Sequence, residues 1–158
     1  MIDDKDEIIA NNLQNNGRMP NAEIARRLDM APSAVFERIR KLEESGVIAG
    51  YEAKLHPESF GLGLLAFVLI RTNDHVGELK TAHEIAKIPW VQEIHDVAGD
   101  DCYVVKLRAR DTRHLGEIMK KHFGGMKSIL STRTTIVLET IKESGKLPLE
   151  TVPLKKGK

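Results

Sequence analysis

The sequence predicts an α+β fold made of two unlike parts. Up to residue 50, apolar residues recur at helical spacing, whereas from Leu64 onward short apolar strands alternate with short amphipathic segments. Between these parts, residues 51–63 hold two glycines and a proline, a composition typical of a linker. We therefore expect a helical domain over 1–50, a linker or hinge strand over 51–63, a second domain over 64–140 and a C-terminal tail over 141–158.

The composition excludes several classes of protein. Lysine and arginine number 24 and aspartate and glutamate 23, a formal net charge of +1, so any binding of nucleic acid must be local. The single cysteine, Cys102, rules out an intramolecular disulfide and suits a reducing cytoplasm. The acidic start of the chain leads into no apolar segment, and the longest apolar run, 64–70, is too short to span a bilayer. We expect a soluble, cytoplasmic protein without membrane contact.

A first helix is expected over residues 3–15. Ile8, Ile9 and Leu13 fall on one face of it, and acidic residues gather in its first turn, where the helix dipole favours them. Asn16 and Gly17 end the helix. It would pack across the next two helices as the first member of a three-helix unit.

The next segment, residues 21–46, is a helix-turn-helix candidate. Asn21 can cap its first helix, residues 29–31 form the turn, and Pro32 fits the first position of the second helix, where a missing N–H costs nothing. Gly46 suits a left-handed C-cap, and residues 47–53 follow as a short extended segment in the place of a wing or linker strand. The expected core of this unit is Ile8, Ile9, Leu13, Ile24, Leu28, Val35, Ile39, Leu42 and Ile48.

The outward face of the second helix of this pair mixes cationic, polar and aromatic side chains. Such a mixture suits phosphates and base edges in the major groove of DNA. A charged face is also what a helix in an ordinary bundle presents to solvent, so the motif alone leaves both interpretations open. Phe36 either touches a thymine methyl group or packs on the first helix. The candidate DNA-binding residues are Ser33, Phe36, Glu37, Arg38, Arg40 and Lys41.

The second domain is expected to contain four strands. The first is continuously apolar, which is typical of a central strand covered on both faces, and the third alternates apolar and charged residues. The second and third form a hairpin around the turn 99–102. The expected strands are 64–72, 91–98, 103–110 and 128–138.

Two helices separate these strands. The first, over 78–86, stops before Pro89, and the second starts at a cap formed by Asp111 or Thr112 and breaks at Gly124. The order strand, helix, strand, strand, helix, strand predicts a ferredoxin-like βαββαβ fold with both helices on one face. The inward residues are expected to be Leu79, Ala82, Ile85 and Ala86 in the first helix and Leu115, Ile118, Met119 and His122 in the second.

The other face of this sheet needs a cover, because its central strands are apolar on both sides. We predict that it packs against the same face of another copy, which makes the protein an obligate dimer. The tail has alternating apolar positions around Pro148 and a basic end. It either adds an edge strand across the dimer through Leu149 or is disordered.

Three segments resemble the Lrp/AsnC family of bacterial and archaeal feast/famine transcription regulators. They are LEESGVIAGYEAKLHPESFG, VAGDDCYVVKLRARD and STRTTIVLE, and they occur in the family's order over essentially the whole chain. The resemblance implies a winged helix-turn-helix domain followed by a RAM-type ferredoxin-like domain. Ala31 departs from the serine common before the proline of the recognition helix, a loss typically worth about 1 kcal/mol. Asp29 replaces the usual turn glycine but tolerates a left-handed conformation.

The resemblance further implies a sequence-specific, double-stranded-DNA-binding regulator that is not an enzyme and forms homodimers and larger assemblies, tetramers or octamers. It implies an amino-acid effector rather than a cofactor, bound between dimers beside the Gly-Asp turn. That turn would face the effector's ammonium group, and the last strand would offer hydroxyls. On residues alone, the turn is an ordinary hairpin turn and Arg133 an interface ion-pair residue. The implied effector-binding residues are Gly99, Asp100, Asp101, Cys102, Thr132, Arg133 and Thr134.

No metal site and no catalytic residues are expected. The six histidines are scattered, and none is spaced with a cysteine or a second histidine as a zinc site requires. The sequence holds neither a nucleophile motif nor a phosphate-binding glycine loop. Two alternatives remain for this architecture: an enzyme resembling the family that decarboxylates siroheme-type tetrapyrroles, and a ligand-independent DNA-architectural protein.

Overall fold

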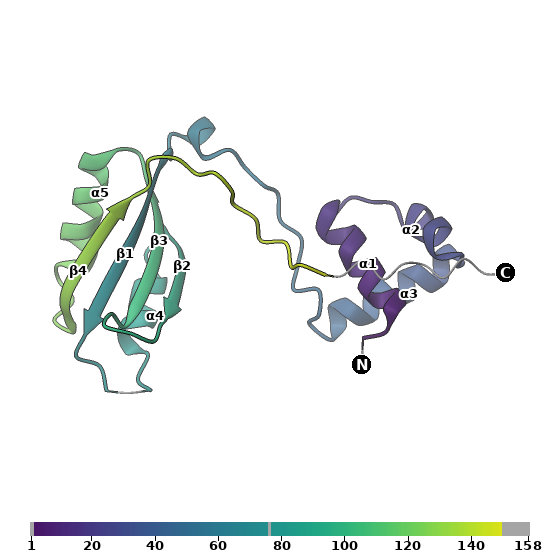
Figure 1. Cartoon of the computed structure of the whole chain (residues 1–158), viewed down its shortest axis with the longest axis horizontal. Coiled ribbons are helices and arrows are strands. Elements are labelled where there is room, and N and C mark those ends of the chain that lie inside the picture. The colour runs from purple at the N-terminus through teal and green to yellow at the C-terminus, as the bar shows by residue number, and fades with distance from the viewer. Residues whose placement is uncertain (1, 76, 150–158) are drawn as a thin grey trace. The chain divides into compact units, whose positions relative to one another are not determined.

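The computed structural model describes residues 2–75 and 77–149. The chain forms two compact units, shown in Figure 1. The helical unit comprises the chain up to Lys54 together with the tail from Glu143, and the sheet unit comprises Leu55 to Lys142. The expected linker is therefore divided between the two units, and the tail returns to the helical unit.

The helical unit contains α1 (Asp4–Asn15), α2 (Asn21–Leu28) and α3 (Pro32–Glu44). The N-cap of α1 is Asp3, whose side chain accepts a hydrogen bond of 2.8 Å from the N–H of Asp6. The prediction that Asn21 caps α2 is wrong. Asn21 is already the first helical residue, and the N-cap is Pro20, which has no side-chain acceptor.

The core of the helical unit confirms the expected helical spacing. Ile8 and Ile48 pack at its edge and are only partly buried, while Ala25 joins the centre. Because all three helices contribute, no pair of them buries its apolar stripe alone. The buried residues are Ile9, Leu13, Ile24, Ala25, Leu28, Val35, Ile39 and Leu42.

The turn between α2 and α3 has the predicted conformation. Asp29 adopts a left-handed backbone with φ of 50°, which its short polar side chain tolerates. Pro32 is the first residue of α3, and Gly46 follows that helix with φ of 74°. Residues 47–53, expected as an extended wing or linker strand, instead form a bend and an irregular stretch. The N–H of Ile48 bonds to the carbonyl of Leu42, which folds this segment back onto α3.

The sheet unit has the predicted ferredoxin-like order of elements. Its elements are β1 (Leu64–Thr72), α4 (Lys80–Ala86), β2 (Val91–Asp96), β3 (Tyr103–Ala109), α5 (Thr112–Ile118) and β4 (Ile129–Ile136). A short 3-10 turn (Pro57–Phe60) precedes β1, and a π-helical turn (Met119–Phe123) extends α5. The four strands form one antiparallel sheet in the order β2-β3-β1-β4, so β1 is central as predicted.

Both helices pack on one face of the sheet, as Figure 1 shows. Val68 and Ile70 of β1 and Val105 of β3 point to this face and are buried with Ile85 of α4 and Ile118 of α5. Side chains alternate along a strand, so the intervening residues of β1 and β3 point to the opposite face. On that open face Phe67, Leu69 and Val104 remain half-buried.

Several expected helix faces need correction. Leu79 is 41% exposed and Ala86 is also exposed, because α4 begins only at Lys80 and turns Thr81 and Ile85 inward. In the second helix, Asp111 is the cap and accepts a bond from the N–H of His114.

The buried residues of the second helix also differ in part from the prediction. Leu115 and Ile118 are buried as predicted, but His114 and Phe123 are buried as well, while His122 is only half-buried. Trp90, at the corner between α4 and β2, meets the His114 ring edge-on with centroids 4.5 Å apart.

Within the single chain, the tail forms neither helix nor strand over residues 143–149. The side chain of Gln14 on α1 bonds to the backbone of Leu147 in this segment. The remainder of the predicted tail, 150–158, lies outside the described residues.

Candidate functional site

The outward face of α3 is open to solvent in the helical unit. Phe36 is 54% exposed, so the alternative in which it packs on α1 is wrong. Ser33, Glu37 and Lys41 are also exposed, at positions that a helix brings onto one side. This surface, the α3 face, therefore presents an aromatic ring, a hydroxyl and charges of both signs.

Arg40 on the α3 face is held between two carboxylates of its own helix. Its Nε and Nη2 donate to Oε2 of Glu37 at 3.2 and 2.9 Å, and its Nη1 donates to Oε1 of Glu44 at 2.8 Å. The pKa of Arg40 is raised, first by its hydrogen bonds to Glu37 and then by the negative charges of Glu37 and Glu44. All three groups are exposed, so a phosphate or base edge can displace either carboxylate at little cost.

Arg38 lies differently from the other candidate DNA-binding residues. Its Nη1 donates to Asp6 at 2.7 Å and to Asp3 at 2.8 Å, which joins α3 to the start of α1. Hydrogen bonds to Asp6 and then to Asp3 raise the pKa of Arg38. Its contact is therefore within the helical unit, and it stands apart from the solvent-facing group of Ser33, Phe36, Glu37, Arg40 and Lys41.

In the sheet unit, the structure brings together some of the expected effector residues. Asp101 in the β2–β3 turn accepts a bond of 2.9 Å from Nη2 of Arg133 on β4. Gly99 adopts φ of 140°, which only glycine reaches easily, and Asp100 beside it is exposed. Cys102 is half-buried and its Sγ accepts a weak bond from the N–H of Thr72 at 3.5 Å.

Thr132 and Thr134 lie on the opposite side of β4 from Arg133. The register pairs Thr132 with Ile70 and Thr134 with Val68, on the face that carries the helices, whereas Arg133 pairs with Leu69 on the open face. Within one chain, the two hydroxyls therefore do not meet the turn that carries Asp101. A site that uses the two hydroxyls together with the Asp101–Arg133 pair therefore requires side chains from both faces of the sheet.

A polar cluster that the sequence did not predict lies beside α4. Thr81 is only 4% exposed, and its hydroxyl lies 2.9 Å from Asp74 Oδ1 and 2.7 Å from the Ser128 hydroxyl. Tyr103 donates to the carbonyl of Glu78, and burial and the nearby charge of Asp74 raise its pKa. These partners come from three separate segments, so no local sequence pattern announces them.

Neither a metal-binding cluster nor a membrane-spanning helix occurs in the part of the chain that the structure describes. Residues 2–75 and 77–149 contain no group of three or more histidine, cysteine or acidic side chains arranged to hold a metal ion. No helix in those same ranges is long and apolar enough to cross a membrane.

Two family models match the chain, one in its N-terminal part and one in its C-terminal part. Residues 2–49 match a winged helix-turn-helix DNA-binding domain, and residues 65–147 match the Lrp/AsnC ligand binding domain. Among curated relatives, the HTH-type transcriptional regulator FL11 of Pyrococcus horikoshii is 37% identical over 94% of this chain and 97% of its own. The leucine-responsive regulatory protein of Escherichia coli K12 is 34% identical over 95% of this chain and 93% of its own.

Solved structures with a similar fold are also those of transcriptional regulators. The transcriptional regulator NMB0573 of Neisseria meningitidis, in complex with L-Met, has a TM-score of 0.87 at 28% identity over 94% of this chain and 97% of its own. Rv3291c, a feast or famine regulatory protein of M. tuberculosis complexed with L-methionine, has a TM-score of 0.85 at 32% identity over 93% and 99%. These proteins are transcriptional regulators rather than enzymes, so the decarboxylase alternative has no support. The chain is a DNA-binding transcriptional regulator that belongs to the Lrp/AsnC family.

Proposed function

We propose that this regulator reads operator DNA with the α3 face and changes its DNA binding when an amino acid binds to the sheet unit. The observation that carries the proposal is the exposure of Ser33, Phe36, Glu37, Arg40 and Lys41 on one side of α3. Their chemistry suits both phosphates and base edges. The net charge of the chain is only +1, so affinity must come from this local surface, repeated by symmetry in a dimer.

An amino acid as the effector is supported by the two related regulators solved with L-methionine. In this chain, Asp101 and Arg133 lie 2.9 Å apart and offer one charge of each sign. A zwitterion carries the two complementary charges, so the ammonium group would approach Asp100 or Asp101 and the carboxylate group Arg133. Thr132 and Thr134 would then contribute from a neighbouring copy, since they point to the other face of β4.

A dimer through the open sheet face is supported by the apolar side chains left there. Phe67, Leu69 and Val104 are half-buried in a single chain, and α4 and α5 cover only the other face. Packing two such faces together would remove these side chains from water. The effector can shift the assembly only by as much as its affinity differs between the assembly states.

The experiment has two parts. The purified chain is first incubated with random double-stranded DNA, and the bound fragments are selected and sequenced; a recurrent motif supports operator recognition. The effector is then tested by measuring the melting temperature of the chain with each of the twenty amino acids. The chain is next run on sizing chromatography with the amino acid that stabilises it most. Absence of any enriched motif would contradict the first part, and absence of any stabilising amino acid would contradict the second. A DNA-architectural protein would instead bind all fragments with similar affinity.

A further inference from the structure

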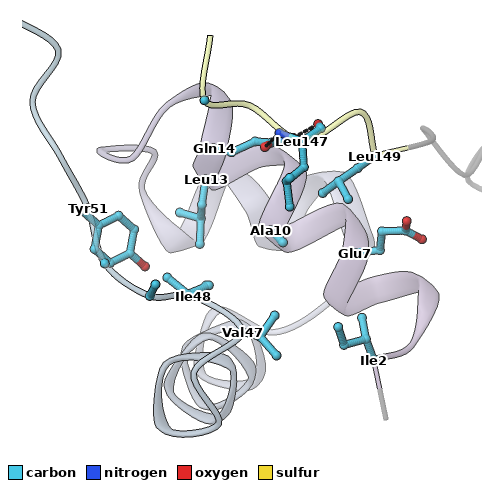
Figure 2. Close-up of a pocket in the computed structure, with 13 residues that line it drawn as sticks. Ile2, Glu7, Ala10, Leu13, Gln14, Val47, Ile48, Tyr51, Leu147 and Leu149 are labelled. Carbon is cyan, nitrogen blue, oxygen red and sulfur yellow. Dashed lines mark hydrogen bonds between the residues drawn. The ribbon is translucent and has the colours of Figure 1, made fainter. Parts of the chain in front are cut away.

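The helical unit carries an apolar groove that the proposed DNA reading does not use. It lies between α1 and the segment that follows α3 and has a volume of about 570 Å³. Figure 2 shows Leu13, Ile48 and Val47 on its walls, with Ile2 at one end and Tyr51 at the other. The tail runs along this groove.

The tail is held there mainly by its backbone. Gln14 of α1 uses its side-chain amide to pair with both backbone groups of Leu147, donating to the carbonyl and accepting from the N–H, each at 3.0 Å. Figure 2 marks these two bonds. A side-chain amide that pairs with both groups of one residue imitates a neighbouring strand, so it recognises the peptide backbone rather than a particular side chain.

Two lysines hold the tail at further points. Lys146 donates to Asn15 of α1 at 2.8 Å, and Lys54 donates to the carbonyl of Glu143 at 3.3 Å. Leu147 and Leu149 both line the groove, where Leu149 is half-buried and Leu147 is 66% exposed. The attachment thus combines four exposed hydrogen bonds with one apolar side chain.

Such an attachment can open. Exposed hydrogen bonds exchange readily with water, and ordering an irregular segment costs conformational entropy, so the net gain on docking is small. A docked tail and a released tail would be two discrete states, as a switching element requires.

We infer that this groove is a binding site for an extended peptide segment, that the chain's own tail occupies it reversibly, and that the docked tail couples β4 to the helical unit. β4 carries Arg133, and only residues 138–142 separate Val137, bonded to Leu65 of the sheet, from the docked Glu143. With the tail docked, two chain connections join the units; with the tail released, only the segment after Tyr51 remains. The coupling part of this inference rests on the proposed effector response, while the docking part does not.

Docking is tested by amide hydrogen exchange on the full-length chain. We expect the N–H of Leu147 to exchange at least about tenfold more slowly than in a synthetic peptide of residues 142–158. Gln14→Ala and Leu149→Asp should each remove this protection, whereas Lys5→Ala on the exposed side of α1 should retain it. Exchange of Leu147 at the peptide's rate in the unaltered chain would overturn the inference.

Coupling is tested on the same full-length variants by operator binding with and without an equimolar mixture of the twenty amino acids. The mixture should change operator affinity of the unaltered chain and of Lys5→Ala equally, and this change should fall at least about threefold in Gln14→Ala and Leu149→Asp. An unreduced response in both variants would refute coupling. If the unaltered chain itself does not respond, the effector proposal fails and the coupling falls with it, while the exchange measurement still decides docking.

Discussion

Arg38 on α3 donates its Nη1 to the carboxylate of Asp6 on α1 at 2.7 Å, across 32 residues of sequence. The same nitrogen reaches Asp3, the N-cap of α1, at 2.8 Å. One guanidinium therefore fixes the start of α1 against the middle of α3. This arrangement distinguishes Arg38 from the exposed cations of the same helix.

Replacement of Arg38 by alanine should destabilise the helical unit. The Asp6 side chain is only 15% exposed, and it would lose its cationic partner. We expect the free energy of unfolding to fall by about 1 kcal/mol in urea denaturation of the full chain. Lys41→Ala, on the exposed side of the same helix, is the control and should unfold at the same urea concentration as the unaltered chain. Equal stability of both variants would show that the hydrogen bonds of Arg38 contribute nothing.

The Asp3 cap should make stability depend on pH at the acid end. The pKa of Asp3 is lowered, first by the N–H of Asp6 and further by Arg38. A carboxyl with a lowered folded pKa contributes stability above its ordinary value of 3.8, and that contribution disappears as pH falls through the lower folded value. Asp3→Asn should thus be less stable than the unaltered chain at pH 6 but indistinguishable from it near pH 2. A difference that persists at the lower pH would contradict this assignment.

Tyr51 should produce the opposite dependence at the alkaline end. Burial, followed by its hydrogen bond of 2.9 Å to Glu43, raises its pKa to about 12. A raised folded pKa means that the contribution is complete below the ordinary value of 10.0 and is lost as pH rises toward 12. Tyr51→Phe should therefore lose less stability than the unaltered chain between those two values. Parallel curves for the two proteins would rule the assignment out.

Glu44 was not among the DNA-binding residues expected from sequence. Its negative charge should weaken the affinity of the chain for non-specific DNA. It lies on the α3 face and neutralises Arg40 from the side opposite Glu37. Glu44→Gln should raise affinity for random DNA and steepen its logarithmic salt dependence by up to about one unit. Glu43→Gln removes the same charge from a residue that faces Tyr51 and serves as the control. Equal behaviour of the two variants would show that position on the α3 face does not matter.

The open sheet face gives a prediction about assembly. Phe67→Asp places a charge among the half-buried side chains of that face, and it should convert the proposed dimer to a monomer in sizing chromatography, because a buried unpaired charge is strongly unfavourable. Ala86→Asp makes a similar change at an exposed position of α4 and should leave the elution volume unchanged. Dimers that survive Phe67→Asp would place the interface elsewhere.

The sequence predicted most of the fold because its elements carry local periodicity. Val35, Ile39 and Leu42 repeat at helical spacing, and Tyr103, Val105 and Leu107 alternate, so burial followed from pattern alone. The inward face of α4 was misassigned because Leu79 precedes the first turn and Thr81 finds hydroxyl and carboxylate partners from other segments. Periodicity counts apolar residues and so misses a buried threonine.

The candidate sites were predictable only in part for the same reason. The exposure of the α3 face followed from helix geometry. The ion pairs of Arg40 with Glu37 and Glu44 lie within one helix, at positions three and four residues apart. The hydrogen bonds of Arg38 with Asp6 and of Leu147 with Gln14 join residues 32 and 133 positions apart, and no local rule predicts such pairs. The separation of Arg133 from Thr132 and Thr134 could have been predicted from strand alternation.

Operator affinity of the double variant Arg40→Ala, Lys41→Ala tests most directly whether the α3 face reads DNA. We expect affinity to fall at least about tenfold, with a salt dependence weaker by roughly one unit for each phosphate that the variant no longer neutralises. Sizing chromatography should show the same assembly as the unaltered chain, and Lys127→Ala in the sheet unit should bind as before. Unchanged operator affinity in the double variant would contradict the account.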